Sequence, residues 1–133
     1  MFKLSSKSLN KMRGQGTGIP LHPDLANIVR KAITTSTIDF GVGEVGRTID
    51  RQIQLHTQGK STTLKSKHLR QDDGYSHAVD LYVYVNGKVS WEHKDFRPVV
   101  QAMFDAAIEQ GTPLRAGCLW RSFQDSPHFE LRS

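Results

Sequence analysis

Apolar residues recur at helical spacing in three segments of the chain, and this pattern predicts three helices. The first covers residues 21–33, with Pro23 suited to its first turn. A second is expected over residues 48–58, although its apolar face is thin. The third covers residues 96–108 and is closed by Gly111.

Alternation of apolar and polar residues predicts short strands between these helices. The clearest begins at Ala78, where Val79, Leu81 and Val83 face one way while Asp80 faces the other. The Asn-Gly pair that follows favours a tight hairpin turn, so this segment continues as a second strand to about residue 91. Further strands are expected over residues 40–45, 114–120 and 129–131.

These elements predict a small single domain of the α+β class, with two or three helices packed on a short antiparallel sheet. We expect residues 1–20 to form a basic arm and a flexible loop, and residues 21–133 to form the domain proper. Residues 60–77 are rich in Ser, Thr, Lys, Gly and Asp and predict a long loop. Loops of that length in compact domains tend to be functional.

The charge balance is basic, because 18 Lys and Arg stand against 13 Asp and Glu for a net charge of +5. Such a surface suits an anionic partner, or it is simply a solvated basic tail. The single cysteine, Cys118, excludes an internal disulfide. Neither a signal peptide nor an apolar run long enough for a membrane span is recognisable, so we expect synthesis in the cytoplasm.

Three polar residues stand out as candidates for chemistry. Asp80 interrupts a strand that is otherwise apolar, where aspartate is disfavoured unless it caps a loop or binds a ligand. His128 follows Asp125 across a Ser-Pro turn, and His68 lies in the middle of the long loop. Two histidines and one aspartate form a ligand set that leaves one position of a zinc ion open to water.

Four motifs give the chain a resemblance to a known peptidase family: Ser66-Lys-His68, Gly74-Tyr-Ser-His-Ala-Val-Asp80-Leu, Val85-Asn-Gly-Lys-Val-Ser-Trp91 and Asp125-Ser-Pro-His128-Phe-Glu-Leu. That family contains the zinc D-Ala-D-Ala carboxypeptidases and dipeptidases and the phage L-alanyl-D-glutamate endopeptidases. The chain looks most like the single-domain phage endolysins of the last group.

The resemblance implies a fold, a metal and a set of roles. It implies zinc bound by His68, Asp80 and His128. Asp125 matches the general base, and Arg47 matches an arginine that binds or polarises the substrate carbonyl. Three residues are candidates for contacting the substrate, namely Ser66, which flanks the first ligand, Tyr82 and Trp120.

Two departures from the family pattern bear on these roles. His68 and Asp80 lie further apart than is usual, so His77 competes as the first ligand. We favour His68, because in a strand that already includes His77 an odd separation from Asp80 would direct the two side chains to opposite faces. Leu119 stands where many relatives have an aspartate before the tryptophan.

The expected function is hydrolysis of the L-Ala-D-Glu bond in the peptidoglycan stem peptide by water that the zinc activates. A monomeric enzyme would then act on the wall after release across the inner membrane. Three alternatives stay open: a D-Ala-D-Ala carboxypeptidase or dipeptidase, a metal-binding domain without catalysis, and a non-catalytic basic module for wall polymer or nucleic acid. Against nucleic acid, the sequence has no motif that combines basic and aromatic residues.

Overall fold

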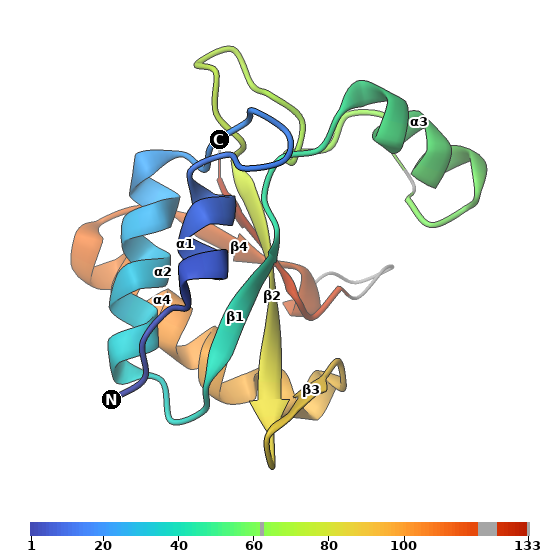
Figure 1. Ribbon diagram of the computed structural model, residues 1–133. Helices are drawn as coiled ribbons and strands as arrows, with labels where there is room; N and C mark the ends of the chain where they lie inside the picture. Colours follow the sequence, from blue (N-terminus) through green and yellow to red (C-terminus); the bar gives the residue numbers. More distant parts are fainter. Residues whose placement is uncertain (62, 120–124, 133) are drawn as a thin grey trace.

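The sheet is organised around β2, which pairs with β1, β3 and β5 (Figure 1). A computed structural model describes residues 1–61, 63–119 and 125–132. Within these ranges the helices and strands are α1 (Ser6–Met12), α2 (Pro23–Thr35), β1 (Phe40–Glu44), α3 (Ile49–Thr57), β2 (Ala78–Val85), β3 (Lys88–Ser90), the 3-10 turn η1 (His93–Phe96), α4 (Arg97–Gln110), β4 (Leu114–Ala116), the 3-10 turn η2 (Gly117–Leu119) and β5 (His128–Leu131).

The five strands form one antiparallel sheet in the order β1-β2-β5-β4, with β3 pairing with β2. β5 therefore lies between β2 and β4. In this register Asp80 stands directly opposite His128, and Val79 stands opposite Phe129. The pairing of β2 with β5 thus brings together two residues that are far apart in the sequence.

The core forms where α2 and α4 pack on each other and on one face of the sheet (Figure 1). Val79, Leu81 and Val83 of β2 face this core and are fully buried, while Asp80 and Tyr82 on the opposite face are only partly buried. This alternation is what the sequence predicted. The prediction of a small α+β domain with an antiparallel sheet is confirmed.

The hairpin between β2 and β3 also has the predicted turn. Asn86 and Gly87 both have positive φ values, 53° and 77°. A two-residue turn whose twist matches that of the strands requires this backbone conformation, and asparagine and glycine adopt it most readily.

The N-terminal segment is not the arm that the sequence predicted, because Ser6–Met12 forms the helix α1. The side chain of Ser5 caps this helix by accepting a hydrogen bond from the Ser8 amide. Ser8 and Met12 are buried, and the Ser8 hydroxyl accepts a hydrogen bond from the Val42 amide of β1. A helix that buries a serine shows too few apolar residues for the hydrophobic pattern to reveal it.

Helix α3 lies where a helix was predicted, but its apolar residues do not face the core. Ile49 and Ile53 are 69% and 50% exposed, whereas the polar side chain of Gln52 is buried. The helix projects from the body of the domain (Figure 1). No helix in the described parts of the chain has the length and apolar character needed to cross a membrane.

Near the C-terminus the strand predicted over residues 114–120 is shorter than expected. It ends at Ala116 and gives way to the 3-10 turn η2. Trp120, a predicted substrate-contacting residue, lies outside the described residues.

Candidate metal centre

His68, Asp80 and His128 come together at the solvent-facing side of the sheet. Asp80 Oδ1 lies 3.2 Å from His68 Nε2 and 3.0 Å from His128 Nδ1. One nitrogen or oxygen from each of the three side chains lies within 4.8 Å of the others. The two histidines are buried, and Asp80 is partly exposed. This group could therefore hold a metal ion while leaving one side open to solvent.

The outer nitrogens of both histidine rings have partners that fix the position of a proton. His68 Nδ1 lies 2.7 Å from the carbonyl oxygen of Val45, which can only accept, so Nδ1 carries hydrogen. His128 Nε2 lies 2.8 Å from Glu130 Oε1 and donates to that carboxylate. The neutral rings consequently direct their lone pairs at the Asp80 carboxylate, and only a proton or another cation between them relieves the repulsion.

The proximity of these groups shifts the pKa values of Asp80 and His128 in opposite directions. Burial alone would raise the pKa of Asp80, but the charge of His68 and the hydrogen bonds from His128 and His68 outweigh it and hold the pKa well below its usual range. Burial alone would lower the pKa of His128, but its hydrogen bonds to Asp80 and Glu130 raise it to about 9. The carboxylates and imidazoles thus stabilise one another's charged forms.

Asp125 lines the same cavity as the three candidate ligands. Burial, together with the neighbouring charge of Asp80, raises its pKa above the ordinary value, against the opposing charges of His128, His68 and Arg47. Its backbone is fixed on both sides, since its amide donates to Gly117 O at 3.0 Å and its carbonyl accepts from the His128 amide at 3.1 Å. A carboxylate with a raised pKa beside a metal site is suited to accepting a proton.

Arg47 lines the same cavity and is held by several partners. Its guanidinium forms an ion pair with Glu44 and donates to Gln52 Oε1 at 2.8 Å. Ser66 Oγ lies 3.5 Å from the guanidinium and also accepts from the His68 amide at 3.1 Å. Ser66 therefore connects the predicted arginine with the predicted first ligand.

Gln52, a partner of Arg47, also contacts the segment that follows α3. Its amide nitrogen donates to Ser61 Oγ at 3.0 Å and to the Thr63 carbonyl oxygen at 2.6 Å. The sequence pattern alone assigns no role to Gln52, Glu44 or Glu130. A buried glutamine on an otherwise exposed helix becomes visible as functional only once the fold is known.

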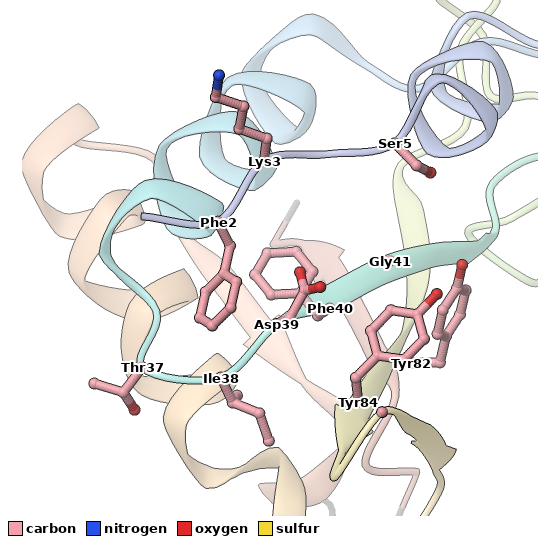
Figure 2. A pocket seen from close by; sticks show the side chains of 11 residues that line it. Phe2, Lys3, Ser5, Thr37, Ile38, Asp39, Phe40, Gly41, Tyr82 and Tyr84 are labelled. Carbon is pink, nitrogen blue, oxygen red and sulfur yellow. The ribbon is translucent and has the colours of Figure 1, made fainter.

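The cavity that these residues line has a volume of about 380 Å³. Besides the residues already described, four cationic side chains line it: Arg51, Lys60, Lys65 and Lys67. Tyr82 shares the strand face of Asp80 but lines a different pocket with Tyr84, Phe2 and Asp39 (Figure 2). The structure therefore does not bring Tyr82 into the cavity of the candidate ligands.

His77, the competing candidate for the first ligand, lies elsewhere. Its Nε2 is 2.7 Å from Asp73 Oδ2, and its ring packs against that of His22. His68 is the histidine that reaches Asp80, as the sequence argument favoured.

Asp80 and His128 on the sheet and His68 on the preceding loop form a group that could hold a metal, and Asp125 and Arg47 line the same cavity. Comparison with known proteins identifies the family. The family model described as phage L-alanyl-D-glutamate peptidase matches residues 1–132, and the chain belongs to this family.

Two individual proteins show the same relationship. The chain is 33% identical over 114 residues to the L-alanyl-D-glutamate peptidase of Escherichia phage T5, covering 83% of this chain and 79% of the phage T5 protein. The crystal structure of the L-Ala D-Glu endopeptidase ChiX from Serratia marcescens superposes with a TM-score of 0.84 at 33% identity. That match covers 98% of this chain and 90% of ChiX.

Proposed function

We propose that this protein is a zinc-dependent peptidase that hydrolyses the L-alanyl-D-glutamate bond of the peptidoglycan stem peptide. Membership of the phage L-alanyl-D-glutamate peptidase family supports the bond, as do the names of the phage T5 and Serratia relatives. Like an endolysin, it would reach the cell wall after release across the inner membrane, and we expect it to act there as a monomer.

The observation that carries the proposal is the direction of the two imidazole lone pairs. Val45 O fixes the proton of His68 on Nδ1, and Glu130 fixes that of His128 on Nε2, so the remaining nitrogens face the Asp80 carboxylate. Two neutral nitrogens and one anionic oxygen match the preference of zinc, and three protein ligands leave its fourth position for water or substrate. The residues therefore fit zinc.

Bound at these residues, zinc would polarise the scissile carbonyl and lower the pKa of its bound water to about 7. The remaining steps fall to the protein. Asp125 takes the proton of the attacking water, which its raised pKa favours, and then passes it to the leaving amine of the glutamate. One carboxylate thus serves first as general base and then as general acid.

Arg47 supplies positive charge within the same cavity. A guanidinium there can stabilise the oxyanion that develops on the scissile carbonyl, or bind a substrate carboxylate with two hydrogen bonds. The ion pair with Glu44 and the hydrogen bond to Gln52 hold the side chain in position. Because these contacts already restrict the Arg47 side chain to few rotamers, it loses little conformational entropy when substrate binds.

Metal removal and two substitutions test the role of zinc separately from the role of Asp125 in proton transfer. Removing zinc with a chelator should abolish lysis of purified peptidoglycan, and adding zinc should restore it. His68→Ala should lose the zinc bound at this site together with activity, whereas Asp125→Ala should keep that zinc and lose turnover. Full lysis by the metal-free protein would exclude the proposal.

The bond itself needs a separate measurement. Mass spectrometry of products from a defined muropeptide should find a new N-terminal glutamate. Release of terminal D-alanine would indicate the carboxypeptidase activity instead.

A further inference from the structure

A second group of two histidines and one aspartate lies outside the proposed catalytic site. It consists of His22, Asp73 and His77, which are each able to offer one ligand atom within 4.8 Å of the others. Asp73 Oδ2 lies 2.7 Å from His77 Nε2 and 3.6 Å from His22 Nε2. The two imidazole rings are nearly perpendicular, with centroids 5.0 Å apart.

The backbone holds these three residues at one place. Residues 20–22 run beside Ser76, where the His22 amide donates to Ser76 O and the Ser76 amide donates to Pro20 O, each at 2.9 Å. The other oxygen of Asp73, Oδ1, accepts a hydrogen bond from the Tyr75 amide at 3.1 Å. That contact turns Oδ2 toward the two imidazoles.

We propose that His22, Asp73 and His77 form a second transition-metal site, one that takes Zn²⁺ or an ion of similar ligand preference. The donor set is again two imidazole nitrogens and one carboxylate oxygen, which zinc binds readily. Asp73 is 39% exposed and the histidines about half as much, so solvent would complete the coordination. An ion can reach the site without any movement of the core.

The hydrogen bonding of His22 should make the zinc affinity of this site lower than that of the first site. His22 Nδ1 accepts from the Asp24 amide at 3.0 Å and so caps helix α2. When Nε2 binds a metal, the neutral ring must carry its proton on Nδ1, and that capping bond is lost. In the first site both rings already have the tautomer that the metal requires. Zinc should therefore fill the first site before the second.

Metal binding at the second site would affect the first site, because both sites use residues of the same loop. Asp73 and His77 belong to the loop that connects His68 with Asp80. A metal bound there would fasten this loop to the start of α2, in addition to the backbone hydrogen bonds at Ser76. It would thus restrict the loop on which the relative position of two catalytic ligands depends.

Titration of the metal-free protein with Zn²⁺ in a calorimeter tests the proposal. The unmodified protein should bind two equivalents, the second more weakly. Asp73→Asn and His77→Ala should each bind one equivalent and keep wall lysis at saturating zinc for the first site. His22→Asn is the matched control, because asparagine caps helices well but brings no imidazole. It should bind one equivalent with an unchanged helical circular dichroism spectrum.

Binding of a single equivalent by the unmodified protein would overturn the second site, as would a second equivalent that survives both Asp73→Asn and His77→Ala. The latter result would mean adventitious binding elsewhere on the surface. His68→Ala and Asp80→Asn keep this outcome separate from the catalytic proposal, since each should retain only the weaker equivalent. If they instead keep the tighter one, the assignment of the catalytic ligands fails.

Discussion

Glu130 offers the sharpest test of how the proposed metal centre is organised. Its carboxylate accepts the Nε2 proton of His128 at 2.8 Å, and both side chains are about nine-tenths buried. Such an acceptor fixes the ring orientation and raises the basicity of the nitrogen that binds the metal. Removing it typically weakens metal binding by about 10- to 100-fold, or roughly 1.4–2.7 kcal/mol.

Two substitutions separate charge from hydrogen bonding. Glu130→Gln keeps the shape and an oxygen acceptor but removes the negative charge, so zinc affinity should fall by about tenfold. Glu130→Ala also leaves the Nε2 hydrogen without its acceptor, and the loss should approach about 100-fold. Competition with a fluorescent chelator measures both affinities, and lysis at saturating zinc measures whether turnover recovers.

Arg115 provides the control for these variants. Its guanidinium lies 4.0 Å from the other oxygen of Glu130, and its side chain is 53% exposed. Exposed ion pairs contribute about 0–1 kcal/mol, so Arg115→Gln should change zinc affinity by less than about fivefold. Wild-type zinc affinity in both Glu130→Gln and Glu130→Ala would refute the role assigned to this carboxylate.

Three further predictions concern other parts of the site. Gly117→Ala would place a methyl group against the backbone of Asp125, so turnover should fall while zinc remains bound; unchanged lysis would contradict this packing argument. Gln52→Ala removes a hydrogen-bond partner of Arg47, and we expect activity to fall by about tenfold, or roughly 1–2 kcal/mol, with zinc affinity unchanged as measured by chelator competition. Folding raises the pKa of His128 to about 9, so the protonated imidazole stabilises the folded zinc-free protein at lower pH. As the pH rises from 6.5 to 9 this protonated form disappears, and the zinc-free protein should lose up to about 3 kcal/mol of stability. Urea unfolding at the two pH values measures that loss, which His128→Asn should not show.

The parts of the fold that the sequence revealed are those in which a repeating pattern meets a clear stop. β2 alternates from Val79 to Tyr84, and the Asn-Gly turn that follows it fixes where the chain reverses. α4 ends at Gly111, whose φ of 77° few other residues adopt. By contrast, α1 buries a serine against β1, so its contacts with the domain leave little trace in the apolar pattern.

The candidate ligands were predictable because each is a polar residue in an unusual place and because the motifs around them resemble a known family. The residues that hold them were not. Glu130 and Gln52 contact His128 and Arg47, only two and five residues away, but these hydrogen bonds depend on the exact fold, and ordinary strand and helix patterns contain such residues everywhere. Likewise, only the path of the loop beside residues 20–22 brings His22 to Asp73 and His77.

Two elements that line the cavity, β5 and α3, differ in how extensively they are packed into the domain. β5 carries His128 in the interior of the sheet, so its backbone amides should exchange with deuterated solvent about as slowly as global unfolding allows. α3 projects from the body and buries chiefly one glutamine, so its amides should exchange through local opening that leaves the sheet intact. The strand that carries His128 should therefore stay closed under conditions in which the helix that carries Arg51 opens.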